Sequence, residues 1–193
     1  MPGKPTLFAL THWLLNAAAI FCMAIAAILA IALGALAVAA SDLTADHLGI
    51  PALMPAPAHD VSRMEVLPIG GTALLGGLLS LLLILFALRA AAGIVQSAIK
   101  GDPFVNANAT RLTRIGWFLT LLIGVQFATK LAVDGMAGRL AAVHHLSLEQ
   151  LNVHFSGGSD ISPVGILAVL LIFVLAQIFR HGSVMRDELQ GTV

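Results

Sequence analysis

The apolar residues of this chain gather into four long runs that are separated by more polar segments. The runs cover approximately residues 14–40, 69–88, 115–133 and 164–179. Each run approaches or exceeds the roughly 20 residues that a helix needs to cross the hydrocarbon core of a bilayer. The pattern therefore predicts an all-α, polytopic membrane protein with four transmembrane helices, in which residues 1–193 form a single domain.

The first run could be mistaken for a secretory signal peptide. It begins soon after Lys4, and Ala37-Val38-Ala39 is similar to a small-residue cleavage site. Its apolar part, however, is far longer than the 7–15 residues of a typical signal-peptide core. We therefore expect this run to be retained as a transmembrane helix.

The basic residues outside the apolar runs predict how the helices are oriented. Lys and Arg are concentrated on the cytoplasmic side of bacterial membrane proteins. The N-terminal arm, the second connection and the tail carry Lys4, Arg89, Lys100, Arg111, Arg114, Arg180 and Arg186, whereas the first and third connections carry Arg63 and Arg139. Both termini and the second connection are therefore predicted to be cytoplasmic.

This orientation assigns a place to each connecting segment. Residues 41–67 form an outer loop that is rich in proline and acidic residues, and residues 180–193 form a cytoplasmic tail. Residues 89–114 form a cytoplasmic helical hairpin between the second and third helices. Good helix formers continue beyond Arg89 until Lys100-Gly101, where a glycine can end the helix.

Two alternatives remain for the start of the third helix. Asp102-Pro103 offers an N-cap residue followed by proline at the first helical position, which predicts a start near Pro103. A start at Asn106 or at Asn108 is the alternative.

Composition and charge narrow the class of protein. The chain is 59% hydrophobic and 10% charged, with a mean hydropathy of +0.96, whereas a typical soluble domain is about 25% charged. So few charges could not cover the outside of a soluble core. The net charge is zero, and we expect no direct contact with nucleic acid. The single cysteine, Cys22, is expected to be a small buried hydrophobe.

Small residues recur at helical spacing in two of the apolar runs. Ala26, Ala30 and Gly34 follow one another at intervals of four in the first run, and so do Thr72, Gly76 and Ser80 in the second. Such rows let helix backbones approach closely within a bilayer. The alternative is that alanine is simply abundant, so we expect packing from the second row more than from the first. The sequence leaves homo-oligomerisation open.

Lys130 and Asp134 form a candidate intramembrane ion pair. They are four residues apart, so they share one helix face. Ionisable residues within a span are functional candidates by default. The third run points outward from Ile115, however, which places both residues near the outer interface, where a lysine can reach water. We favour this structural interpretation.

The remaining residue pattern predicts neither a metal site nor a catalytic site. Histidines gather in the outer connections beside acidic residues, at His47, His59, His144, His145 and His154. Their spacing matches no metal motif. The sequence contains no nucleophile elbow and no phosphate-binding glycine loop. We therefore expect no metal, no cofactor and no enzymatic activity.

The segment between the second and third runs carries a recognisable motif. Gly101-x-Pro103-Phe104 is followed by Asn108-x-x-Arg111-Leu112-x-x-Ile115-Gly116, and the tail contains Phe179-Arg180-x-Gly182 and ends with Thr192-Val193. These residues resemble the signature of a bacterial family of four-helix membrane proteins, domain of unknown function 2975. The resemblance covers nearly the whole chain and implies the bacterial inner membrane. It also implies a helix-turn-helix regulator as a partner, and it implies no established activity.

The motif residues permit a hypothesis about their roles. We expect Phe104 to pack across the hairpin and Asn108 to cap its helix or bond to the neighbouring one. We expect Arg111 to pair with lipid phosphate or with Asp187 and Glu188 of the tail. The alternative is that these residues only end and restart helices at an interface.

Three classes of function are compatible with this pattern. The first, which we favour, is a non-enzymatic membrane scaffold or regulator that binds a cytoplasmic protein through the hairpin and tail. The second is a small oligomeric transporter or channel, which would need more polar groups at mid-membrane than these runs supply. The third, an integral membrane enzyme, would need a convergent acid, base or metal site.

Overall fold

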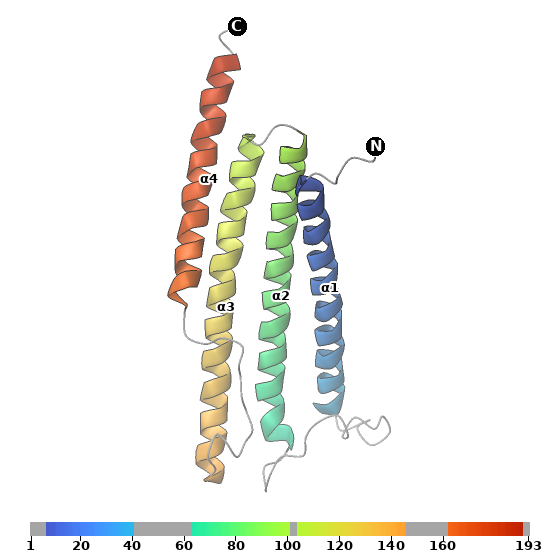
Figure 1. The fold of residues 1–193 in the computed structure, drawn as a ribbon. Coiled ribbons are helices and arrows are strands. Elements are labelled where there is room, and N and C mark those ends of the chain that lie inside the picture. Colours follow the sequence, from blue (N-terminus) through green and yellow to red (C-terminus); the bar gives the residue numbers. More distant parts are fainter. Residues whose placement is uncertain (1–6, 41–62, 101–103, 146–161, 191–193) are drawn as a thin grey trace. The chain divides into compact units, whose positions relative to one another are not determined.

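All the described residues outside short connections lie in four long α-helices (Figure 1). The computed structural model describes residues 7–40, 63–100, 104–145 and 162–190, and excludes the side chains of residues 7–9, 38–40, 63–64 and 186–190. The helices are α1 (Leu7–Ala40), α2 (Arg63–Ile99), α3 (Asn106–His144) and α4 (Pro163–Gln190). By length and composition, each helix could cross a membrane. The all-α prediction is confirmed.

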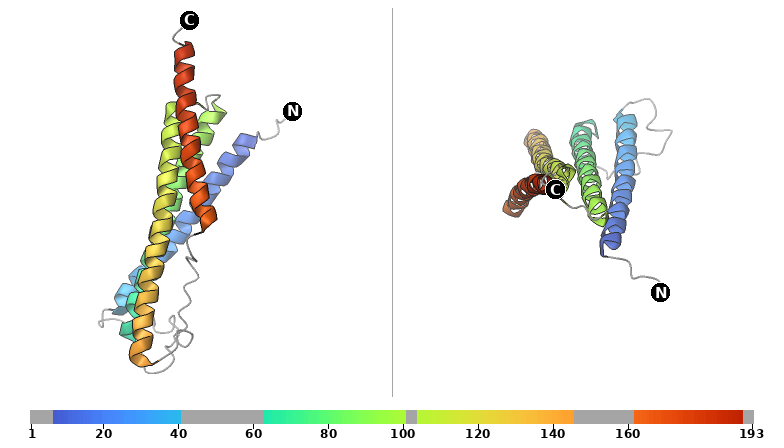
Figure 2. Two further views of the ribbon diagram at one scale, coloured as in Figure 1. Left: turned by 90° about the vertical axis from the view of Figure 1, so that its left-hand side faces the viewer. Right: turned by 90° about the horizontal axis from the view of Figure 1, so that it is seen from above.

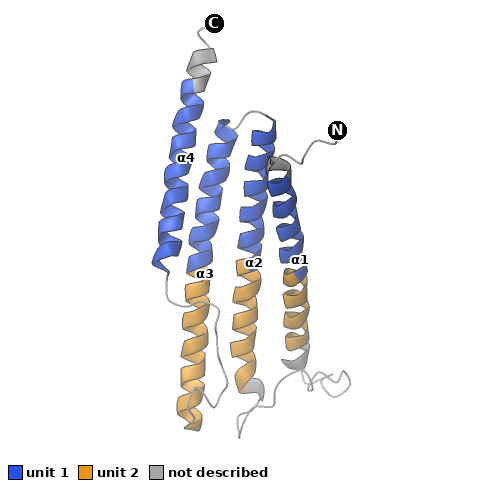
Figure 3. Ribbon diagram, viewed as in Figure 1, with its two compact units in different colours: residues 1–24, 81–123, 161–193 blue, residues 25–80, 124–160 orange. Residues whose placement is uncertain are grey.

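The helices contribute to two compact units, shown in different colours in Figure 3. Helices α1, α2 and α3 have residues in both units, whereas α4 belongs to the first alone. Unit 1 comprises Met1–Ala24, Leu81–Ile123 and Ile161–Val193, and unit 2 comprises Ile25–Ser80 and Gly124–Asp160.

Helix α2 begins earlier than the proline-rich sequence before it predicts. The outer loop was expected to extend to Leu67, but the helix starts at Arg63 and contains Pro68. Pro68 lies in the second turn of the helix, so its missing N–H removes only one backbone hydrogen bond near the N-terminus of the helix. The Pro68 carbonyl also accepts a hydrogen bond from the Thr72 hydroxyl at 2.8 Å. The predicted loop is therefore too long at its C-terminal end.

Helix α2 ends where the sequence predicts, and α3 begins at one of the alternative starts. Helix α2 runs to Ile99, and Lys100 lies in the turn that follows, as predicted. The preferred start of α3 near Pro103 is wrong, because Phe104 and Val105 are not helical and α3 starts at Asn106, the alternative. Proline fixes only its own φ and does not force the next residues into a helix. The Val105 carbonyl accepts the Asn108 N–H at 2.8 Å and closes the first turn.

Helix α3 continues well past Val133, where the third run was expected to end. It extends to His144, and His145 follows with a φ of 53°. A left-handed residue directly after a helix is a common way to end it. Residues 146–161 lie outside the described part of the chain.

Unit 2 is held together by close packing of α2 against α3. Ile69 on α2 and three residues of α3 form its buried core, namely Val133, Ala137 and Leu140. A Cβ atom added to Gly76 would lie only 2.8 Å from the Cβ of Thr129, so the two backbones approach at this point. The row that contains Gly76 therefore packs α2 on α3, as predicted.

Within the part of the chain that the structure describes, helix α1 shows no close approach at Gly34, which belongs to the row from which less packing was expected. Among the described residues nothing lies within 4 Å of the Cβ position of Gly34. Its larger side chains approach glycines of α2 instead: Leu36 lies 3.6 Å from the Cβ position of Gly71, and Leu29 lies at the same distance from that of Gly77. Glycines of α2 therefore leave room for these side chains of α1.

Unit 1 is held together by aromatic contacts. Phe86 of α2 stacks on Phe118 of α3, with 5.7 Å between ring centroids. Trp117 of α3 meets Phe173 of α4 edge to face at 5.8 Å. Such pairs contribute about 0.5–1.5 kcal/mol beyond the area they bury. Figures 1 and 2 show α4 alongside α3 in this unit.

Candidate functional site

A cluster of polar residues joins α2 to α3 in unit 1. Helix α2 supplies Gly93 and Ser97, which are four residues apart, and α3 supplies Asn108 and Arg111, which are three apart. Both spacings place two residues on one face of a helix. The two faces meet next to the connection between the helices, and we call these four residues the polar cluster.

Asn108 is the centre of the polar cluster and is completely buried. Its side-chain nitrogen donates to the Ser97 hydroxyl at 2.5 Å, and its Oδ1 accepts from Arg111 at 2.9 Å. The Ser97 hydroxyl in turn donates to the Ile94 carbonyl at 2.7 Å. A buried amide would be costly without partners, and here both of its ends are bonded. The expected bond from Asn108 to the neighbouring helix is confirmed.

Arg111 lies across the surface of α2. Its Nη1 donates to the Gly93 carbonyl at 2.8 Å as well as to Asn108. A Cβ atom at Gly93 would lie 2.9 Å from Nε and 3.1 Å from Cζ of Arg111. A side chain at residue 93 would therefore require the guanidinium group to shift. The sequence pointed to Arg111 and Asn108 but missed Gly93 and Ser97, which share their spacing with many chance pairs in an alanine-rich helix.

Phe104 and Arg111 contact different helices. Phe104 packs against α4, with its ring centroid 5.2 Å from that of Phe179 and its Cδ1 3.4 Å from the Cβ position of Gly182. Its packing across the hairpin stays a prediction. The hydrogen bonds described for Arg111 go to α2 and to its own helix, and its pairing with lipid phosphate stays a prediction. Asp187 and Glu188, its expected tail partners, have side chains outside the described part.

Two further motif residues serve packing. Leu112 is buried, and a Cβ atom at Gly116 would lie 2.9 Å from the Phe173 ring of α4. Gly101 and Pro103 lie outside the described residues. The motif therefore marks the positions where α3 meets α2 on one side and α4 on the other.

The other candidate residues lie in unit 2. Lys130 is half-buried and Asp134 is exposed, one turn apart on α3, and their pairing stays a prediction. The sequence also gave no sign that His144 would meet Glu65. Their Nε2 and Oε2 atoms are 3.2 Å apart, which is the distance of an ion pair when the histidine is protonated. This contact links the end of α3 to the start of α2.

The polar cluster can hold two helices together, and its guanidinium group can bind an anion. It contains no carboxylate or imidazole that could transfer a proton. Within the ranges that the structure describes, no three His, Cys, Asp or Glu side chains come together as metal ligands would.

These features define an all-α protein with four helices long and apolar enough to span a membrane. The model of one protein family, "Protein of unknown function (DUF2975)", matches residues 47–193, and the chain belongs to that family. The matched residues include α2, α3 and α4 with the polar cluster, and exclude α1. No curated protein and no solved structure matches the chain.

Proposed function

We propose that this chain is a multi-pass protein of the bacterial inner membrane that acts as a scaffold or regulator, without catalysis. It would bind a cytoplasmic protein at the end of unit 1 that carries the connection between α2 and α3. This proposal keeps the predicted orientation, in which that end and both termini are cytoplasmic. The family resemblance suggests a helix-turn-helix regulator as the partner.

One observation supports this proposal above the others: α4 continues past its contact with Phe104. Residues 183–190 add roughly 12 Å of helix at 1.5 Å per residue beyond Gly182. Val184 and Met185 on this extension are 53% and 60% exposed. If residues 180–193 form the predicted cytoplasmic tail, these large apolar side chains lie outside the lipid, where such exposure is typical of a protein contact.

The surroundings of this extension indicate the chemistry of the partner. Lys100 and Arg114 are exposed at the same end of unit 1, together with Phe104. A partner with an apolar patch bordered by acidic residues would complement them. Arg111 and Asn108 bond within the chain, so they would position this surface rather than contact the partner.

The proposal is tested with the full-length protein and a cytoplasmic protein identified by cross-linking at Met185. Replacing Val184 and Met185 together by aspartate should weaken binding to that protein about tenfold or more, since charges would enter an apolar contact. Val143→Asp is the matched control, because Val143 is 71% exposed in unit 2 and should leave binding unchanged. The proposal would be contradicted if the unaltered protein, the double variant and Val143→Asp all bound the partner with equal affinity.

A further inference from the structure

Arg89 is a charged residue of unit 1 that does not belong to the polar cluster. It lies inside α2 among apolar residues, and its side chain is exposed. Its Nη2 lies 3.9 Å from the sulfur of Met23 in α1, and a thioether is a weak acceptor. A guanidinium group on an apolar helix is costly unless an anion or water accompanies it.

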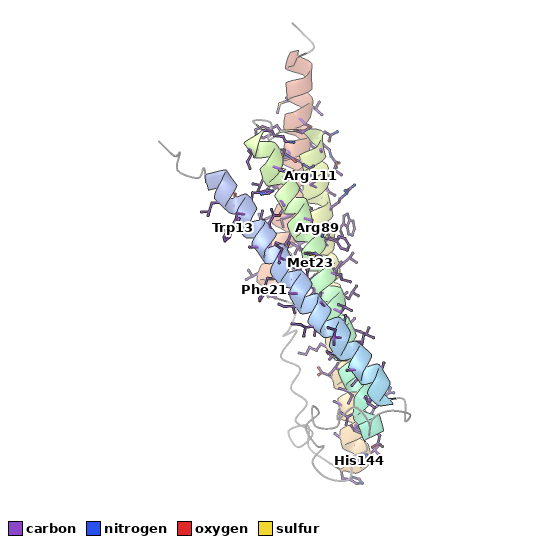
Figure 4. The ribbon with its side chains drawn as sticks, turned by 90° about the vertical axis from the view of Figure 1, so that its right-hand side faces the viewer. Trp13, Phe21, Met23, Arg89, Arg111 and His144 are labelled. Carbon is purple, nitrogen blue, oxygen red and sulfur yellow. The ribbon has the colours of Figure 1, made fainter. Side chains whose placement is uncertain are left out.

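Arg89 lies on α2, and the guanidinium group of Arg111, which belongs to α3, lies against α2 one turn further along. Gly93, on which the Arg111 guanidinium lies, is four residues from Arg89 and shares its helix face. Figure 4 shows Arg111, Arg89 and Met23 one after another along this side of the unit. The two hydrogen bonds described for Arg111 both come from Nη1. Its Nε and Nη2 can therefore donate to another group.

The described side chains of unit 1 include no carboxylate that could neutralise these arginines. The cations described there are Arg89, Lys100, Arg111, Arg114 and Arg180, and the carboxylates Asp102, Asp187 and Glu188 lie outside the described side chains. A phosphate diester carries two free oxygens, which match the paired N–H groups of guanidinium. The guanidinium groups of Arg89 and Arg111 therefore favour binding of a phosphate group.

The neighbours of Arg89 indicate where that phosphate would come from. Phe86, one turn before Arg89 on α2, is 48% exposed, and Met23 of α1 is 41% exposed. A free phosphate ion gains nothing from apolar side chains beside it, whereas the acyl chains of a lipid do. Basic sites between transmembrane helices on the cytoplasmic side are known to bind anionic headgroups.

We propose that Arg89 and Arg111 together bind the phosphate of an anionic membrane phospholipid, with the acyl chains against Met23 and Phe86. This site is separate from the partner surface at Val184 and Met185, and it is tested without any partner protein. Arg111 joins the site to the polar cluster, so the bound lipid would hold α1 beside the α2–α3 pair.

The test uses full-length protein in detergent, titrated with phosphatidylglycerol or with phosphatidylcholine, and counts bound lipid by native mass spectrometry. The unaltered protein should bind phosphatidylglycerol about tenfold more tightly, because only this headgroup carries net negative charge. Inorganic phosphate added in excess should not displace it. Displacement by phosphate would assign the site to a free anion and overturn the proposal.

Variants then locate the site. Arg89→Gln should lower the affinity for phosphatidylglycerol about tenfold, and Arg89→Lys should lower it about threefold, since lysine keeps the charge but loses the fork geometry. Arg180→Gln removes another exposed charge, on α4 of the same unit, and serves as the matched control. Equal losses for Arg89→Gln and Arg180→Gln would show diffuse attraction, and no loss in either would show no site. Both results would overturn the proposal.

Discussion

Single residues decide how closely these helices approach, and Gly76 shows this most clearly. Its added Cβ would lie 2.8 Å from the Thr129 Cβ, an atom fixed to the α3 backbone that cannot rotate away. Gly138, in the same unit, has nothing within 4 Å of its Cβ position among the described residues. Two glycines in similar helices should therefore respond in opposite ways to the same substitution.

We predict that Gly76→Ala lowers the free energy of unfolding by about 1–3 kcal/mol, because overpacking forces the helices apart. Gly138→Ala should have no cost, since alanine is the better helix former by about 1 kcal/mol. Unfolding in mixed detergent measures both. Adding Thr129→Ala to Gly76→Ala should recover part of the loss. If Gly76→Ala is as stable as Gly138→Ala, the close approach at this point does not exist.

The hydrogen bond between Asn108 and Ser97 can be measured separately from the rest of the polar cluster. A double-mutant cycle with Ser97→Ala and Asn108→Ala should give a coupling energy of about 0.6–1.7 kcal/mol, the range found between membrane helices. Asn108→Ala alone should cost more, because it also leaves Arg111 with one partner fewer. A coupling energy near zero would mean that the two side chains do not interact in the folded protein.

At the scale of elements, the sequence predicted the existence of the helices better than their ends. Long apolar runs and turn residues identify four helices and the end of α2 at Ile99, because these depend on local preferences. The starts of α2 and α3 were misplaced, because Pro68 and Pro103 were read as boundaries. The packing partner of Phe104 also could not be predicted, since contact with α4 brings together residues far apart in the chain.

The contact between α4 and the connection before α3 gives a prediction about the position of α4. Cysteines at Phe104 and Gly182, in a Cys22→Ala background, should form a disulfide on mild oxidation. Phe104 Cδ1 lies 3.4 Å from the Gly182 Cβ position and is two bonds from the Phe104 Cβ, so the two Cβ positions are at most about 6 Å apart, and a small movement brings them to disulfide distance. Cysteines at Phe104 and Leu175 are the control, since Leu175 lies roughly 10 Å further along α4. The loss of reactive thiols reports the bond. Equal oxidation of both pairs would contradict the docking of α4 described above.

At the scale of the whole molecule, the distribution of charge predicts which ends of the helices face the cytoplasm. The polar cluster, the α4 extension and the two arginines of the proposed lipid site all belong to unit 1, which also contains most of the basic residues used in that prediction. The proposed partner surface and lipid site therefore both depend on one property, the orientation of the chain in the membrane.

The orientation is tested with single cysteines at Asp60 and at Asn106 in the Cys22→Ala background. Asn106 is exposed at the first turn of α3, so its cysteine is accessible from whichever side holds that end. Since Lys and Arg favour the cytoplasmic side, an impermeant maleimide added to intact spheroplasts should label position 60 alone. After lysis it should label both. Labelling of position 106 in intact spheroplasts would reverse the orientation, and a cytoplasmic partner could then no longer reach Val184 and Met185.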